Sequence, residues 1–136
     1  MSRGYKYGIR YIPRIGKLND PDTSFYRAMR GVQLTQVSKV EMMFDPFTGK
    51  QAESIRSFAF HLDTHKIRQT NFKCSVKLNV VCDRSEPSMQ VKFNNGDNAL
   101  FKTQNLTAQE IAEEFKVLCG IYERKAAEEE SKKKRR

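Results

Sequence analysis

The segment from Phe72 to Cys82 alternates strictly between apolar and polar or basic residues, and it constrains the fold more than any other stretch. Because alternate residues of a β-strand point to opposite faces of a sheet, this period predicts a strand with one apolar face and one polar, basic face. We expect protein to cover the apolar face and water or a polyanion to meet the other. The contrast favours a binding module over an enzyme. The apolar positions are Phe72, Cys74, Val76, Leu78, Val80 and Cys82, and Lys73, Ser75, Lys77 and Asn79 lie between them.

The chain has 136 residues, a length that suits one domain with modest extensions. Its formal net charge of +9 is concentrated at the two ends. Residues 1–36 hold seven Lys and Arg against two Asp, residues 126–136 hold five against three Glu, and residues 37–125 are close to balance. We therefore predict a basic N-terminal extension (1–36), a folded domain (37–125) and a charged C-terminal tail (126–136).

The N-terminal extension is basic, poor in acids and interspersed with tyrosines. This composition fits a mitochondrial transit peptide and equally a retained nucleic-acid-binding arm. Serine is scarce, and glycines together with Pro13 interrupt any amphipathic helix, which favours the arm. Within the extension we expect only a helical turn or two, around residues 24–29. The basic residues before the first acid are Arg3, Lys6, Arg10, Arg14 and Lys17.

Residues 37–62 carry the signature of a strand followed by a helix. Val40, Met42 and Phe44 recur at every second position, which predicts a strand over residues 37–44. Thr48 and Gln51 have the spacing of a capping box, so we expect the helix to begin there. Its apolar stripe is Ala52, Ile55, Phe58, Ala59 and Leu62. With the strand at 72–82, this order predicts a βαβ unit whose two strands are parallel.

Residues 83–125 complete the sheet and add a second helix. Alternation at Met89, Val91 and Phe93 predicts a third strand, and the Asn-Gly pair at 95–96 predicts a hairpin into a short fourth strand at 99–103. Thr107 and Glu110 form a second capping box. The helix that follows has the stripe Ile111, Phe115, Leu118 and Tyr122. The residues beyond 125 lack such a stripe, and we expect them to be disordered or ordered only on a partner.

The predicted order is β-α-β-β-β-α, an α/β fold with a four-stranded mixed sheet and both helices on one face. The opposite face is then open and displays Lys73, Ser75, Lys77, Asn79, Gln90, Lys92 and Asn94. Lysines on such a face suit phosphate contacts, and tyrosines in the arm suit base stacking. Alternatively, the strand lysines only keep the face soluble, and the tail is a simple solvated end. The candidate RNA-binding residues are Arg3, Lys6, Arg10, Arg14, Lys17, Arg27, Arg30, Lys73, Lys77, Lys92, Lys132, Lys133, Lys134, Arg135 and Arg136.

Catalytic and metal-binding motifs have no candidate in the sequence. His61 and His65 lie four residues apart, but no third ligand is evident, so we predict no metal site and no cofactor. No glycine-rich phosphate loop or Gly-x-Ser-x-Gly motif occurs, which favours a protein without a small-molecule substrate. No apolar stretch approaches the ~20 residues of a membrane span. We interpret the three cysteines, Cys74, Cys82 and Cys119, as buried reduced thiols.

A distributed set of short motifs resembles one known family. Together, in this order and spacing, they resemble mitochondrial large-subunit ribosomal protein number fifty-three, over residues 37–122. The motifs are Phe44-Asp45-Pro46-Phe47, Glu53-Ser54 with Arg56 and Phe58, Arg68 with Thr70-Asn71, Cys74-Ser75-Val76, Ser85-Glu86-Pro87, Val91-Lys92-Phe93, Gly96, and Leu106-Thr107-Ala108 with Glu110.

This resemblance implies a thioredoxin-like fold without redox chemistry. The turn Asp45-Pro46-Phe47-Thr48 stands where a redox thioredoxin holds its active cysteines, and it contains none. Thioredoxin topology also requires the link at 83–87 to cross over the first strand. The shortness of that link favours a plain hairpin instead; we follow the resemblance.

For function, the resemblance implies a non-catalytic structural component of the mitochondrial ribosome, located in the matrix. Its expected partners are the large-subunit rRNA and neighbouring large-subunit proteins, with a position towards the factor-binding stalk. Two alternatives stay open. One is a small accessory subunit of another mitochondrial complex; the other is a thioredoxin-like oxidoreductase, which would need a cysteine of low pKa near a helix N-terminus.

Overall fold

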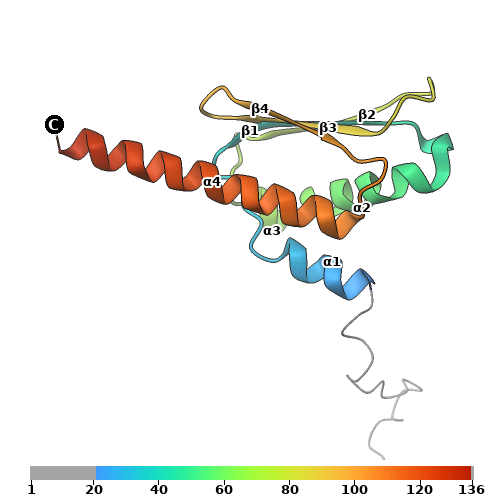
Figure 1. Cartoon of the computed structure of the whole chain (residues 1–136), viewed down its shortest axis with the longest axis horizontal. Helices are drawn as coiled ribbons and strands as arrows, with labels where there is room; N and C mark the ends of the chain where they lie inside the picture. The colour runs from blue at the N-terminus through green and yellow to red at the C-terminus, as the bar shows by residue number, and fades with distance from the viewer. Residues whose placement is uncertain (1–20, 136) are drawn as a thin grey trace, which may run out of the picture.

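A computed structural model describes residues 21–135 as two layers, a four-stranded sheet and a layer of helices on one of its faces (Figure 1). This arrangement confirms the predicted order of strands and main helices. In the described part of the chain, no helix combines the length and the apolar character of a membrane span. The elements are α1 (Pro21–Met29), β1 (Val37–Phe44), η2 (Pro46–Ala52), α2 (Glu53–Leu62), α3 (His65–Arg68), β2 (Ser75–Val80), β3 (Ser88–Phe93), β4 (Asn98–Lys102) and α4 (Ala108–Lys134).

The strands lie in the order β2-β1-β3-β4. β1 and β2 are parallel, as the βαβ interpretation predicts, whereas β3 is antiparallel to both β1 and β4. The link between β2 and β3 therefore passes the end of β1, which confirms the crossing that the resemblance implies. The hairpin between β3 and β4 turns at Gly96, whose φ of 90° lies in the left-handed region that favours glycine.

The core lies between the sheet and the helices. The stripe predicted on α2 is buried in full, from Ala52 to Leu62. Phe58 of α2 meets Phe115 of α4 edge to face, with ring centroids 5.5 Å apart. The capping box of Thr107 and Glu110 at the start of α4 is present, as predicted. The apolar face of the central strands is therefore covered by α2 and α4, and α4 begins where its local capping signal places it.

The start of the first helical segment differs from the prediction. Thr48 and Gln51 do not form a capping box; the Thr48 hydroxyl donates to the Asp45 carbonyl instead. Asp45 is the N-cap, and its Oδ1 accepts the Phe47 N–H at 2.8 Å. Pro46 follows at the first helical position, where its missing N–H costs nothing. The helix therefore starts earlier, as a 3-10 turn interrupted at Gly49, before α2 proper begins at Glu53.

Asp45 also anchors the crossing link. Its Oδ2 accepts the Arg84 N–H at 2.9 Å, across 39 residues of sequence, although the Asp45 side chain is almost completely buried. Arg84 has a φ of 57°, a conformation that non-glycine residues adopt only occasionally. One carboxylate thus fixes both connections that leave this end of the β1–β2 pair.

Residues 24–36 belong to the packed structure rather than to an extended arm. Phe25, Met29 and Leu34 are buried in the same core as the strands, and α1 packs against α4. Asn71 holds the following loop by donating to the carbonyls of Leu34 and Val37, each at 2.9 Å. The core therefore extends across the predicted boundary at residue 36. A nine-residue helix is marginal by itself, so its stability depends on this distant contact.

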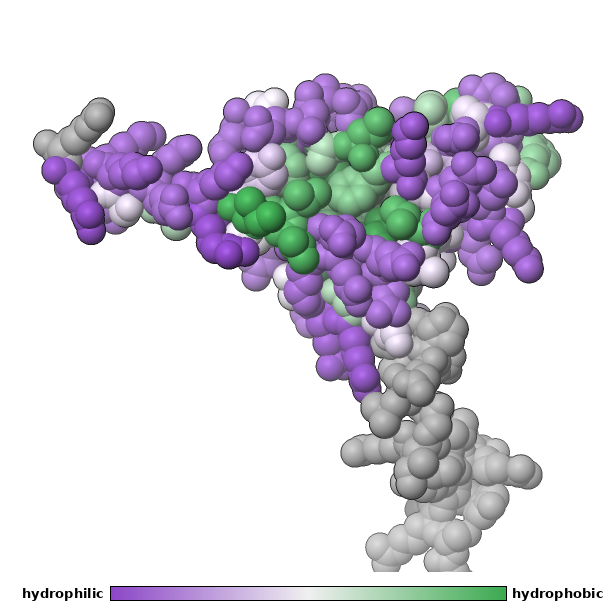
Figure 2. All heavy atoms as spheres, viewed as in Figure 1, coloured by the Kyte–Doolittle hydropathy of each residue, from purple (hydrophilic) through white to green (hydrophobic). Residues whose placement is uncertain are grey.

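The C-terminal tail also differs from the prediction, because α4 continues as a helix to Lys134. Glu128, Glu129 and Glu130 each precede a lysine by four residues, the orientation that stabilises a helix. Ala126 and Ala127 add high helix propensity. In Figure 1 this part of α4 extends beyond the sheet. Figure 2 shows that its surface is hydrophilic, whereas apolar residues gather between the sheet and α4.

We predict that Asp45→Asn lowers the free energy of unfolding by about 1–3 kcal/mol. The amide keeps the size of the carboxylate, but it cannot accept both buried N–H groups without turning its own donors towards one of them. Urea unfolding followed by circular dichroism measures the change. Asp83→Asn is the matched control, because Asp83 accepts the Ser85 N–H in the same link but is exposed. Equal effects of the two substitutions would contradict the anchoring role of Asp45.

Candidate nucleic-acid interface

The face of the sheet that the helices leave open is the candidate functional site. On β1, Val40, Met42 and Phe44 point into the core, so Lys39, Glu41 and Met43 point the other way. The strand registers carry this face across the sheet. Its three rows are Ser75, Lys39, Lys92 and Asn98; Lys77, Glu41, Gln90 and Leu100; and Asn79, Met43, Ser88 and Lys102.

The charges of this face are unbalanced. Within these rows, four lysines stand against one carboxylate, that of Glu41. The Lys39 ammonium forms an ion pair with Glu41. Hydrogen bonding from Lys39 lowers the pKa of the Glu41 carboxyl below its usual value of 4.5, the positive charges of Lys92 and Lys77 add to this effect, and desolvation opposes it. The carboxylate therefore sits in a positive field, and the open face as a whole attracts anions.

Most of the face that the sequence predicts is present. Ser75, Lys77, Asn79, Gln90 and Lys92 all lie on it. Two other predicted members are just outside the strands. The backbone N–H of Lys73 donates to Asn71, and the Asn94 side chain donates to the carbonyl of Thr35.

Sequence reasoning missed two lysines of the face, Lys39 and Lys102. The signal was available, because each alternates with residues that the structure packs inward: Val40 beside Lys39, and Phe101 beside Lys102. The registers of β1 and β4 against β3 are what place both lysines on the open face.

The remaining predicted cations lie elsewhere. Arg27 of α1 and Arg30, the residue after α1, are exposed in the helical layer. At the far end of α4, the exposed cations are Lys132, Lys133, Lys134 and Arg135. The structure therefore distributes the described candidates over three separate surfaces. Six candidates fall outside the described residues: Arg3, Lys6, Arg10, Arg14, Lys17 and Arg136.

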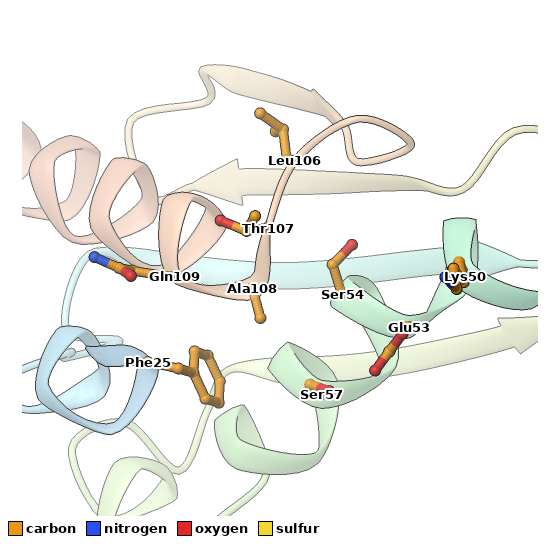
Figure 3. Close-up of a pocket in the computed structure, with 9 residues that line it drawn as sticks. All are labelled: Phe25, Lys50, Glu53, Ser54, Ser57, Leu106, Thr107, Ala108 and Gln109. Carbon is orange, nitrogen blue, oxygen red and sulfur yellow. The ribbon is translucent and has the colours of Figure 1, made fainter. Parts of the chain in front are cut away.

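A pocket of about 400 Å³ lies in the helical layer, away from the open face. Figure 3 shows Ser54 and Ser57 of α2 on one side and Thr107 with Ala108 at the start of α4 on the other, with Phe25 of α1 at one end. The Ser54 hydroxyl donates to the carbonyl of Thr103, so it is engaged in structure. The lining contains no histidine that could act as the general base for a serine.

The three cysteines are free, and two of them are buried. Burial raises the pKa of Cys74, against the effect of Arg68, and raises the pKa of Cys119 to about 12. Both shifts disfavour the thiolate that redox chemistry requires. Cys82 is exposed, which corrects the prediction that all three are buried: it lies two residues beyond Val80, the last residue of β2, outside the packed strand.

The two histidines have separate environments. His61 packs between aromatic rings, with its centroid 4.9 Å from that of Phe25 and 5.1 Å from that of Tyr26. His65 lies 2.8 Å from the side-chain amide of Gln69. Across residues 21–135, no group of three or more His, Cys, Asp or Glu side chains is placed to hold a metal ion.

The fold defines an α/β domain with a thioredoxin-like arrangement, in which an Asp-Pro-Phe-Thr turn stands between β1 and the first helical segment. Residues 44–96 match the family model of 39S ribosomal protein L53/MRP-L53. This match confirms the resemblance to the mitochondrial large-subunit ribosomal protein family that the sequence predicts. It supports the large subunit of the mitochondrial ribosome as the particle to which the chain belongs.

The effect of the neighbouring lysines on the pKa of Glu41 can be tested by substitution. We predict that Lys39→Gln raises the pKa of Glu41 towards its usual value of 4.5, because the substitution removes the ammonium group whose charge and charge-assisted hydrogen bond lower it. A ¹³C carboxyl titration by NMR measures this directly. Lys102→Gln, two strands away from Glu41, serves as the control and should leave the Glu41 titration almost unchanged. A Glu41 pKa that is indifferent to Lys39 would contradict the described geometry.

Proposed function

We propose that this chain is a non-catalytic structural component of the large mitochondrial ribosomal subunit and that it binds rRNA through the open face of its sheet. The observation that carries the proposal is the one-sided charge of that face, four lysines against one carboxylate in the described strands. In a protein of the ribosome, the polyanion available to such a face is rRNA.

The geometry of the face suits phosphate contacts rather than base recognition. Neighbouring strands lie about 4.8 Å apart, so the four strands present lysines over a nearly flat width of about 14 Å. Lys77 is exposed, and Lys92 and Lys39 are half-buried. A flat basic surface meets the wide, shallow minor groove or the backbone of RNA without entering a groove deeply.

The charged ends supply further contacts in this proposal. Residues 1–36 and 126–136 act as extensions around the domain at 37–125, although residues 24–36 also pack against it. Arg27 of α1, Arg30 just after it and the four exposed cations at the end of α4 reach RNA beside the helical layer. Neighbouring large-subunit proteins, towards the factor-binding stalk, contact the surfaces that RNA leaves free.

The oxidoreductase alternative has no support from a specific observation. The turn that would hold the reactive cysteines holds Asp45 instead, and its carboxylate is occupied by two backbone donors. Cys119 lies within α4, far from the helix start, and its pKa of about 12 keeps the thiol protonated at neutral pH. We therefore retain the structural role alone.

The proposal predicts how RNA affinity depends on salt. In the double variant Lys77→Ala with Lys92→Ala, the slope of log affinity against log salt should fall in magnitude by roughly 0.7–0.9 for each lysine that contacts a phosphate. Co-sedimentation of the full-length protein with purified large-subunit rRNA over a salt series measures the slope. The matched control is Lys50→Ala with Lys66→Ala, which removes the same charge from exposed positions on the helical layer. Equal slopes for the two double variants would refute the role of the open face.

A further inference from the structure

β2 is an edge strand with an uncovered apolar side. Within residues 21–135, no strand pairs with its outer side. Phe72, Leu78 and Val80 are exposed by 77%, 48% and 55%, contrary to the prediction that protein covers the apolar residues of this segment. Only Cys74 is buried, and Val76 is half-buried. The physical reason is that α2 covers β1 but does not extend over the outer half of β2, so the apolar face of the edge strand is left in contact with solvent.

Of the apolar residues of β2, Leu78 and Val76 line a groove of about 750 Å³ between β2 and α2. Its floor contains Met42 and Phe44 of β1, and Leu78 stands on its β2 side. Phe60 of α2, exposed by 76%, forms the opposite wall. Two exposed aromatic or aliphatic walls over a buried floor are typical of a surface that another protein covers.

The backbone of β2 is arranged to accept a further strand on this side. The Val81 N–H donates to the Phe44 carbonyl, so Val81 faces β1. Because successive residues of a strand direct their backbone groups to opposite sides, Ser75, Lys77 and Asn79 also face β1, whereas Val76, Leu78 and Val80 face outward. The free N–H and C=O groups therefore belong to the residues whose side chains line or border the groove.

The charged residues around the β2 edge are mainly basic, which favours an acidic partner. Residues 72–82 carry two lysines, Lys73 and Lys77, and no acid. Arg56 lies beside the groove and is exposed, with no ion-pair partner among the described residues, whereas Asp63 on the same rim pairs with Arg68 at 3.5 Å. A second copy of this chain would place lysines against lysines across an antiparallel pair, which is destabilising. The apolar groove offers nothing to RNA phosphates.

We propose that an extended segment of a neighbouring ribosomal protein, in which apolar residues alternate with acidic ones, adds to β2 as a fifth strand. Its apolar side chains fill the groove against Leu78 and Phe60, and its acidic side chains lie near Lys73, at the start of the edge, which leaves Lys77 to the rRNA. This inference rests on the proposed function, since the partner is a component of the same particle.

Photocrosslinking in purified large subunits tests the occupant. The photoreactive residue p-benzoylphenylalanine replaces Leu78 in the full-length protein, and mass spectrometry identifies the crosslinked segment. The expected product is a ribosomal-protein segment with alternating apolar and acidic residues. Crosslinks to rRNA, to residues 1–20 of this chain, to a second copy, or to nothing would each overturn the proposal. The same replacement at Leu100, an even more exposed residue of the other edge strand, is the control and should not crosslink to that segment.

Hydrogen–deuterium exchange with residue-level fragmentation tests the strand pairing separately. The amides of Val76, Leu78 and Val80 should exchange about tenfold more slowly, or slower still, in the assembled subunit than in the free protein, and those of Lys77 and Asn79 should change little. Unchanged exchange at the three outward amides would exclude strand addition while leaving the proposed function intact. Absence of the chain from purified large subunits would instead refute the proposed function itself.

Discussion

The burial of one sheet face under α2 and α4 is the constraint on which the rest of the structure depends. Phe58 and Phe115 meet edge to face within that layer, and truncating a buried phenylalanine typically costs about 3–5 kcal/mol. Because the helices that form this contact lie on the same side, no element within residues 21–135 covers the opposite face. The polar residues of β1, β2 and β3 therefore lie on the uncovered face of the sheet. Since core packing does not constrain these side chains, their charges can serve the binding of a partner.

Local signals in the sequence are sufficient for most of the fold. The alternation in β1 and β3, the Thr107 capping box and the Asn-Gly turn each determine an element by contacts within a few residues. The role of Asp45 could not be predicted in this way, because its second hydrogen bond joins a residue 39 positions later. The strand order likewise involves the distant link that Asp45 anchors, and only the family resemblance predicted it. The helical tail was predictable, since its Glu-to-Lys spacing of four residues is visible in the sequence.

The candidate site was predictable in part. Lys77 and Lys92 follow from period two alone, whereas Lys39 and Lys102 require the registers of β1 and β4 against β3. The exposed apolar side of β2 was not predictable, because the alternation that indicates a buried face is the same whether a helix covers it or a partner does. How far α2 reaches over the edge strand is a property of helix length and packing angle, which no pattern within residues 72–82 encodes.

The account depends most on the claim that the open basic face meets rRNA. A density map of the purified large mitochondrial ribosomal subunit tests it directly, by showing what lies against β1, β2 and β3. The account predicts phosphate oxygens within about 4 Å of the ammonium groups of Lys77 and Lys92, the distance of an ion pair. An open face that borders solvent, or one covered only by protein, would contradict it.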